Sequence, residues 1–227
     1  SSTISELVRS GELDGWDDPR APTVASLRRR GIRGQAIVDA MVGLGTSTSN
    51  VDLAMSSIYA NNRDLIDEGT DRAFLVRDDA DHGGGAVRRQ VLGGPEAGHP
   101  PVHPNHEDRG DRTLSVEGGV YVESEDLPPH GERVWLKGYG CVQHTRDALQ
   151  YTGDDIDVVR EGEVDVIHWV PAEGSLETRL RTMDGDIDGY AEPGLGGYEP
   201  DDLVQFERVG FARIDAFGWA TGDDEFD

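Results

Sequence analysis

Apolar residues in the first 70 positions recur at the spacing of helices. Val24 and Leu27 lie three apart in a short segment that ends at Gly31, a residue able to adopt the left-handed conformation of a helix end. The same spacing predicts a second helix over 34–44 and a third over 52–63. The chain therefore begins with a small helical domain, which we place at residues 1–70.

From residue 71 the pattern changes to short runs rich in Val, Ile and aromatic residues, separated by Gly, Pro and Asp. Many short strands with polar turns are typical of a barrel or sandwich, and not of a parallel sheet. The predicted fold class is α+β, with a small all-α domain followed by an all-β region over 71–227. The strands are expected at 73–76, 87–92, 113–116, 120–123, 133–142, 156–160, 164–170, 176–183, 203–206 and 209–214.

Charge changes this picture, because 45 acidic residues face 21 basic ones and give a net charge of -24. Lys137 is the only lysine, so the other basic residues are arginines. This skew resembles the composition of halophilic proteins, whose carboxylates keep them hydrated at high salt. High charge with 36% hydrophobic residues is also typical of disorder, but four tryptophans and many Val/Ile runs argue for a folded core.

The single cysteine, Cys141, excludes an internal disulfide and a cysteine-based metal site. No apolar run approaches the roughly 18 residues that a membrane span requires, and the N-terminus has no signal-peptide profile. We expect a soluble, cytoplasmic protein with no membrane partner. A phosphate-binding loop of the GxxxxGK type is also missing from the sequence, so no nucleotide site is predicted within it.

The segment 15–32 reads Gly-Trp-Asp-Asp-Pro-Arg-Ala-Pro-Thr-Val-Ala-Ser-Leu-Arg-Arg-Arg-Gly-Ile. It resembles the segment that follows the KMSKS-type loop in glutamyl- and glutaminyl-tRNA synthetases of the archaeal/eukaryotic type. Residues 1–5 then resemble the tail of that loop. Segments 101–112, 133–139, 166–170 and 206–215 resemble the anticodon-binding barrels of the same family, in the same order.

The resemblance implies a helical stem-contact domain at 1–70 and two anticodon-binding β-barrels within 71–227. It implies a glutamate–tRNA ligase, which attaches glutamate to tRNA using ATP and Mg. The catalytic domain of that enzyme would lie upstream, so this part alone would hold no catalytic residue, no cofactor and no metal, and would be inactive. The implied partners are the glutamate tRNA, and the glutamine tRNA as a second substrate, together with the chain's own catalytic domain. DNA is not an expected partner.

Ten residues are candidates for tRNA contacts. Arginines of the first segment would bind phosphates at the inner corner of the tRNA, which positions the RNA without reading its sequence. In the barrels, one face of the strand 133–139 and the pair 179/181 would contact bases of the anticodon loop. The candidates are Arg20, Arg28, Arg29, Arg30, Arg33, Arg133, Trp135, Lys137, Arg179 and Arg181.

Three other readings remain open at this point. The first is a glutaminyl-tRNA synthetase, which belongs to the same subclass. The second is an acidic protein-interaction module. The third is a zinc site at His99, His103 and His106, which the prolines between them disfavour.

A chain this acidic should repel RNA unless its charges are arranged to avoid it. At molar salt the Debye length is about 3 Å, so distant carboxylates are screened and only contacts at hydrogen-bond range matter. We therefore expect carboxylates to be sparse around the arginine clusters and dense elsewhere.

Overall fold

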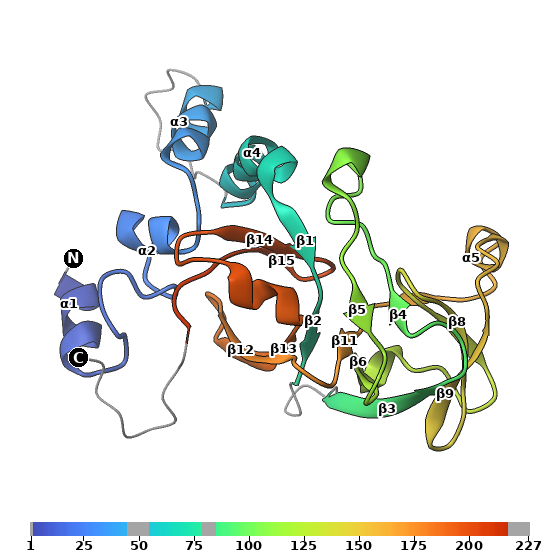
Figure 1. Cartoon of the computed structure of the whole chain (residues 1–227). Helices are drawn as coiled ribbons and strands as arrows, with labels where there is room; N and C mark the ends of the chain where they lie inside the picture. The colour runs from blue at the N-terminus through green and yellow to red at the C-terminus, as the bar shows by residue number, and fades with distance from the viewer. Residues whose placement is uncertain (1, 45–54, 79–84, 218–227) are drawn as a thin grey trace. The chain divides into compact units, whose positions relative to one another are not determined.

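A computed structural model describes residues 2–44, 55–78 and 85–217 of the chain (Figure 1). The chain divides into two compact units. The helical unit contains the residues up to Thr70, Tyr198–Val204 and the residues from Phe211 on. The strand unit contains Asp71–Gly197 and Gln205–Gly210. The first boundary coincides with the end of the predicted all-α domain, but the helical unit also includes C-terminal residues that the sequence pattern placed in the β region.

The helical unit contains the helices that the apolar spacing predicts, and one more. The additional helix is α1 (Ser2–Arg9). The predicted helices are α2 (Val24–Arg29), α3 (Gly34–Gly43) and α4 (Met55–Ile66), and residues 52–54 of the predicted third helix lie outside the described residues. The predicted α+β class is confirmed, because these helices are followed along the chain by strands.

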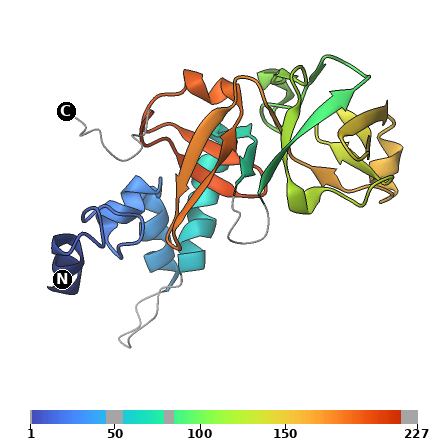
Figure 2. The ribbon, with the colours of Figure 1, turned by 90° about the horizontal axis from the view of Figure 1, so that it is seen from below.

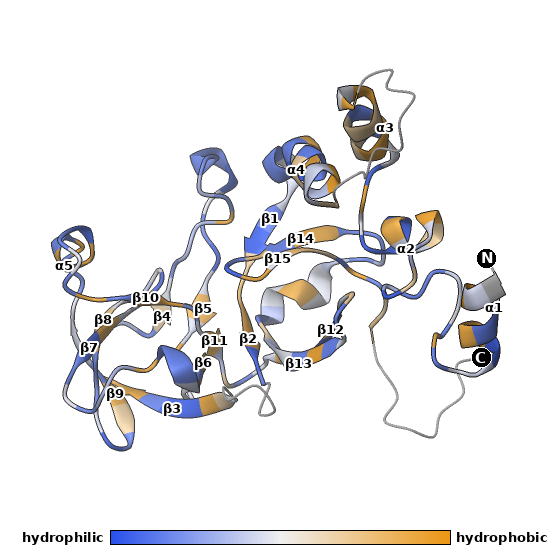
Figure 3. Ribbon diagram, turned by 180° about the vertical axis from the view of Figure 1, so that it is seen from behind, coloured by the Kyte–Doolittle hydropathy of each residue, from blue (hydrophilic) through white to orange (hydrophobic). Residues whose placement is uncertain are grey.

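Helices α3 and α4 pack against each other (Figure 2), and small residues of α3 make this contact close. Ala36 and Ala40 are buried, and Asn61 of α4 donates a hydrogen bond to the carbonyl oxygen of Ala36 at 3.4 Å. Met41 is another apolar residue of the same helix, but it is 60% exposed. Much of α3 is apolar (Figure 3), so the pattern alone does not show which apolar residues are buried.

Thr23 caps the N-terminus of α2, the helix that carries the arginine run. Its Oγ1 accepts a hydrogen bond from the backbone N–H of Ser26 at 2.9 Å and donates one to the carbonyl oxygen of Trp16. At the other end Gly31 has a φ of 79°, as predicted, and a Cβ there would lie 2.9 Å from Leu203. The cap and the glycine together fix where this short helix begins and ends.

Thr23→Ala is expected to destabilise the protein by about 1 kcal/mol, because it leaves an N-terminal N–H of α2 without its acceptor. Urea unfolding followed by far-UV circular dichroism measures the effect. Val24→Ala is a matched control on the same helix, since Val24 is 74% exposed, and should change the free energy of unfolding by less than about 0.5 kcal/mol. Equal effects of the two substitutions would contradict the capping role.

The strand unit is built on a seven-stranded sheet that curls around its core (Figure 1). Most neighbouring strands are antiparallel, but β10 with β7 and β3 with β9 are parallel. In order across the sheet the strands are β10 (Val166–Ile167), β7 (Arg133–Leu136), β8 (Gly140–His144), β9 (Ala148–Gly153), β3 (Ala86–Leu92), β6 (Val120–Glu123) and β11 (Val170–Pro171).

Smaller sheets and short helices complete the described residues. The strand order is β1–β14–β15 in one three-stranded sheet and β12–β13–β2 in the other, while β4 pairs with β5. These strands are β1 (Asp71–Ala73), β2 (Leu75–Arg77), β4 (Ala97–Gly98), β5 (Leu114–Ser115), β12 (Leu176–Arg181), β13 (Asp186–Ala191), β14 (Leu203–Phe206) and β15 (Gly210–Arg213). The short helices are η1 (Asp67–Gly69), η3 (Glu107–Arg109), η4 (Ser124–Asp126), α5 (Asp157–Arg160) and η5 (Pro193–Gly197).

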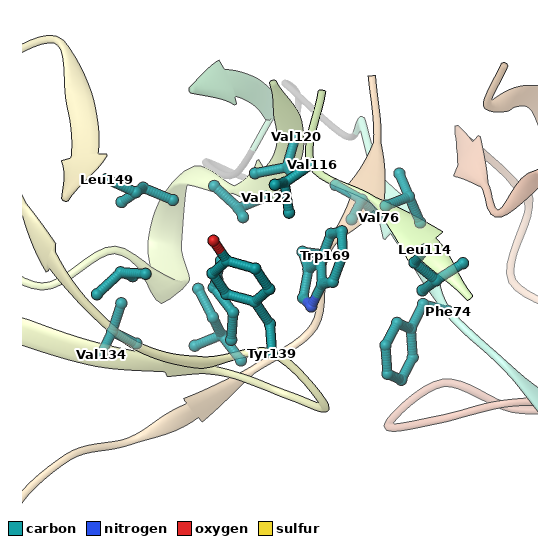
Figure 4. Close-up of a cluster of buried hydrophobic side chains, with 14 residues drawn as sticks. Phe74, Val76, Leu114, Val116, Val120, Val122, Val134, Tyr139, Leu149 and Trp169 are labelled. Atoms are coloured by element: carbon teal, nitrogen blue, oxygen red, sulfur yellow. The ribbon is translucent and has the colours of Figure 1, made fainter. Parts of the chain in front are cut away.

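The core of the strand unit surrounds Trp169, which is fully buried beside Tyr139 (Figure 4). The two rings are edge-on, with centroids 6.0 Å apart, and the Trp169 Nε1–H donates a hydrogen bond to the carbonyl oxygen of Lys137 at 3.0 Å. Valines and leucines of the seven-stranded sheet complete the cluster. This hydrogen bond ties the turn that carries Lys137 to the core.

Four predicted strands have a different structure. The run 73–76 is divided between β1 and β2, and the run 164–170 between β10 and β11. The run 133–142 is a hairpin, because Gly138 turns the chain between β7 and β8 with a φ of 73°. A Cβ at Gly138 would lie 2.5 Å from the backbone nitrogen of Pro100. The run 156–160 contains the helical turn α5 instead of a strand, and the carboxylate of Asp155 accepts a hydrogen bond from the N–H of Asp157 at its start.

Candidate nucleic-acid interface

Three arginines at and after the end of α2 have no carboxylate partner among the described residues. Arg28 and Arg33 are exposed, and neither side chain forms an ion pair within the part of the chain that the structure describes. Arg30 lies over the ring of Tyr59, with its guanidinium carbon 5.5 Å from the ring centroid, and donates a hydrogen bond to the Tyr59 hydroxyl at 2.9 Å. Among the candidates of the helical unit, these three arginines are the ones that form no ion pair with the described residues.

Arg29, in the same run, is occupied by acidic neighbours. Its guanidinium donates hydrogen bonds to Asp215 at 2.5–3.2 Å and to Asp17 at 3.4 Å. The hydrogen bonds to Arg29 lower the pKa of Asp215, while the same contact raises the pKa of Arg29. Asp215 also pairs with Arg213 at 2.9 Å. Arg29 therefore joins α2 to the C-terminal segment of the helical unit.

Arg20 is also paired, with a carboxylate that has no exposed surface. Its Nη2 lies 2.7 Å from Asp18, whose side chain is completely buried. This hydrogen bond is the largest cause of a strongly lowered pKa of Asp18, which keeps the carboxylate charged. Asp18 in turn accepts a hydrogen bond from the backbone N–H of Asp14 at 3.0 Å. Arg20 thus supports the loop that precedes α2.

The predicted base-reading face of β7 is only partly available to a ligand. Arg133 and Trp135 share one face, as alternation requires, and Val134 lies on the other in the main core. Trp135 is 8% exposed, because it is packed in a second cluster with Cys141 and Val164. A base cannot stack on a covered ring, so the structure does not support the proposed role of Trp135.

Arg133 and Lys137 each face a glutamate. Arg133 lies 3.1 Å from Glu163, and both side chains are nearly half exposed. Lys137 forms an ion pair with Glu207 in which the lysine side chain is 34% and the glutamate 16% exposed.

Arg179 and Arg181 share a face of β12, as predicted, and each lies directly opposite an aspartate of β13. Arg179 pairs with Asp188 at 2.7 Å and Arg181 with Asp186 at 3.3 Å. The hydrogen bond from Arg179 lowers the pKa of Asp188. Exposed pairs of this kind contribute about 0–1 kcal/mol, so an incoming phosphate can replace the aspartate at small cost.

Carboxylates were expected to be sparse around the arginine clusters, and among the described residues only Arg28, Arg30 and Arg33 of the candidate cations form no ion pair. Six of the ten candidates form an ion pair with an aspartate or glutamate. The physical reason is composition, since 45 acidic residues leave few guanidinium groups without one in reach. The expectation is therefore wrong for the strand-unit candidates and for Arg20 and Arg29.

Sequence reasoning missed a buried polar cluster next to Lys137. Arg112 stacks over the ring of Phe74, with its guanidinium carbon 4.6 Å from the centroid, and pairs with the buried carboxylate of Glu192 at 3.3 Å. The ring of His168 also stacks on the ring of Phe74, with the two centroids 4.8 Å apart. Arg112 and His168 lie within the segments 101–112 and 166–170, which carried the family resemblance. Their place in those segments was the feature of the sequence that could have pointed to them.

Burial changes the acidity of two groups in this cluster. It lowers the pKa of His168 to about 4, so this histidine is neutral at pH 7. Burial raises the pKa of Glu192, while its ion pair with Arg112 and the hydrogen bond from the N–H of Phe74 oppose that change. The cluster therefore keeps a neutral imidazole and a carboxylate whose charge depends on Arg112.

The histidines considered for zinc have other partners. His103 is buried and edge-on to His106, with centroids 4.5 Å apart, and its Nδ1 accepts a hydrogen bond from the N–H of Asn105. His99 Nδ1 lies 3.4 Å from the hydroxyl of Thr113. Across residues 2–44, 55–78 and 85–217, no three His, Cys, Asp or Glu side chains are grouped to hold a metal ion. Within the same ranges, none of the helices has the length and apolar character that crossing a membrane requires.

Comparison with known protein families gives two matches, which lie between residues 71 and 215. The family model described as "tRNA synthetases class I (E and Q), anti-codon binding domain" matches residues 71–161, and a second model with the same description matches residues 166–215. The first match begins where the strand unit begins.

Relatives of the chain carry the name Glutamate--tRNA ligase. The chain is 70% identical to that of Haloarcula marismortui over 215 residues, which are 95% of this chain and 37% of the relative. Identity to the ligase of Natronomonas pharaonis is 63% over 215 residues, or 95% of the chain and 36% of the relative. For Methanosarcina mazei it is 35% over 222 residues, or 95% and 37%.

The chain spans little more than a third of the length of these relatives. The two matches with the family models cover well over half of the chain, in the order expected from the sequence. The chain belongs to the class I tRNA synthetases of the glutamate and glutamine type, of which it carries the anticodon-binding domains.

Proposed function

We propose that the chain is the tRNA-recognising portion of a glutamate–tRNA ligase. The observation that carries the proposal is the pair of anticodon-binding matches together with relatives named for glutamate, which also favours glutamate over glutamine. The ATP- and Mg-dependent joining of glutamate to tRNA would take place in the remainder of the longer enzyme, and the protein would act in the cytoplasm.

Within this proposal residues 1–70 are the stem-contact domain, and residues 71–227 form two anticodon-binding barrels. Arg28, Arg30 and Arg33 would bind phosphates at the inner corner of the tRNA, because their side chains have no carboxylate partner among the described residues. Lys137, Arg179 and Arg181 would contact the anticodon loop.

Binding of glutamate tRNA, measured by fluorescence anisotropy in molar KCl, tests the proposal. The chain should bind the tRNA and lose affinity when the anticodon loop is replaced by an unrelated sequence of the same length. Equal affinity for both RNAs would favour the acidic protein-interaction module instead. Preference for glutamine tRNA would favour the glutaminyl enzyme.

The double substitution Arg28→Gln/Arg33→Gln is expected to weaken tRNA binding about 10-fold and to reduce the slope of log K against log [KCl] by about two. Each substitution removes one cation that binds a phosphate, so the decrease in affinity should be equal for authentic and replaced anticodon loops. Arg160→Gln is the control, because Arg160 is 71% exposed on α5 but is not a candidate for binding tRNA. An unchanged salt slope in the double variant would show that these arginines do not touch the RNA.

A further inference from the structure

The ion pair of Lys137 is the outer end of a row of alternating charges inside the strand unit. Lys137 pairs with Glu207, and Glu207 lies 3.7 Å from Arg112. Arg112 pairs with Glu192 at 3.3 Å. Side-chain exposure falls along the row, from 34% at Lys137 through 16% and 11% to 5% at Glu192. A partly exposed cation is thus connected to a buried carboxylate through two intermediate groups.

Arg112 has hydrogen-bonding capacity that the row does not use. Its Nη1 donates to the carbonyl oxygen of Arg72 and to Glu192. Its Nε and Nη2 are buried and have no hydrogen-bond partner among the described residues, although Nη2 lies 3.7 Å from a carboxylate oxygen of Glu207. Buried donors without acceptors are costly, so a closer approach of Glu207 to Arg112 would be favourable.

Two positions are therefore available to the Glu207 carboxylate. In the free protein it contacts Lys137, and a small movement would bring it into hydrogen-bond distance of Arg112. Arg112 is held in place by Phe74 and Glu192, so the second position is already formed.

We propose that Glu207 is a specificity-determining residue: it neutralises Lys137 in the free protein and transfers to Arg112 when Lys137 contacts a correct anticodon loop. The inference rests on the proposed tRNA-binding function. An arbitrary phosphate that approaches Lys137 meets the Glu207 carboxylate and is repelled. Only an RNA that places an acceptor on the lysine and fits closely enough to displace Glu207 recovers the energy of the pair through Arg112.

Glu207→Gln tests the inference, because it removes the charge and keeps the shape. The probes are two RNA hairpins with the stem of the glutamate anticodon arm, one with its own loop and one with a replaced loop. The variant should bind the replaced-loop hairpin about 10-fold more tightly and the authentic hairpin within about 3-fold of wild type. The salt slope for the replaced loop should increase by about one, since Lys137 becomes free to bind a phosphate.

Glu123→Gln is the matched control, because it also releases a partly exposed strand-unit cation, Arg77, from a glutamate, and Arg77 is not a candidate for binding tRNA. It should leave the ratio of the two affinities unchanged. If Glu207→Gln weakens both hairpins equally, Glu207 is only structural and the inference is wrong, while loop-dependent binding by the wild type still supports the proposed function. Loop-independent binding by the wild type would instead overturn the proposed function.

Lys137→Gln tests the same idea should Glu207→Gln fail to fold. Because Glu207 already neutralises Lys137 in the free protein, the lysine should contribute little to binding of the replaced loop. The variant is expected to lose about 10-fold in affinity for the authentic hairpin and less than 2-fold for the other. Equal losses on both hairpins would contradict the exchange.

Discussion

Replacing Trp169 with alanine is expected to lower the free energy of unfolding by about 3–5 kcal/mol. The ring is completely buried at the centre of the strand-unit core and contacts Tyr139. Its removal also leaves the carbonyl oxygen of Lys137 without its hydrogen bond. Since domains are stable by about 5–15 kcal/mol, the loss is a large part of the total.

Urea unfolding in KCl, followed by far-UV circular dichroism, measures this effect. Trp169→Phe should cost less, because it keeps an aromatic ring and removes only the indole N–H and part of the volume. Leu92→Ala is the control in the same unit, since Leu92 of β3 is 49% exposed, and should cost less than about 0.5 kcal/mol. A Trp169→Ala protein as stable as the control would contradict the described core.

Acid should destabilise the protein through His168. Burial lowers the pKa of this histidine from 6.5 to about 4 in the folded state. Between these values the unfolded chain binds a proton that the folded protein does not. The stability that His168 contributes is therefore complete above about pH 6.5 and is lost as the pH falls towards 4, by about 3 kcal/mol in total.

His168→Gln isolates this contribution, because the substitution removes the titrating group and leaves the other acids unchanged. Between pH 7 and pH 4.5 the free energy of unfolding should fall by about 2.5 kcal/mol more in the wild type than in the variant. Glu192, whose pKa is raised, acts in the opposite direction, but it does so in both proteins and cancels in the comparison. Parallel pH curves for the two proteins would show that His168 is accessible to protons.

Helices α2, α3 and α4 and most strands could be predicted because their apolar residues repeat regularly, as in α3 and β6. Strand β13 could not, since its sequence Asp-Ile-Asp-Gly-Tyr-Ala has poor strand propensity. It is stabilised by cross-strand pairs such as Asp188 with Arg179, which depend on the fold. Tertiary contacts override local preference there.

The candidate site was predicted in part for a similar reason. The position of a cation can be inferred from a motif. Arg28 is exposed and Lys137 is partly exposed, as a binding role requires. Which cations are neutralised depends on partners far away in the sequence, as with Arg29 and Asp215. The burial of Trp135 likewise depends on Val164, which no strand alternation reveals.

The helical unit is formed by stretches that lie far apart in the sequence, and this has a consequence for biosynthesis. Arg29 and Asp215 are 186 residues apart, and the unit is completed only by residues from Phe211 on. During translation, α2 therefore emerges from the ribosome long before Asp215, the more closely placed of the two aspartates that pair with Arg29. The strand unit, most of which is the continuous stretch Asp71–Gly197, can acquire its structure earlier. We expect cotranslational folding to begin in the middle of this chain. The helices at its start should reach their final structure only after the strand unit has folded.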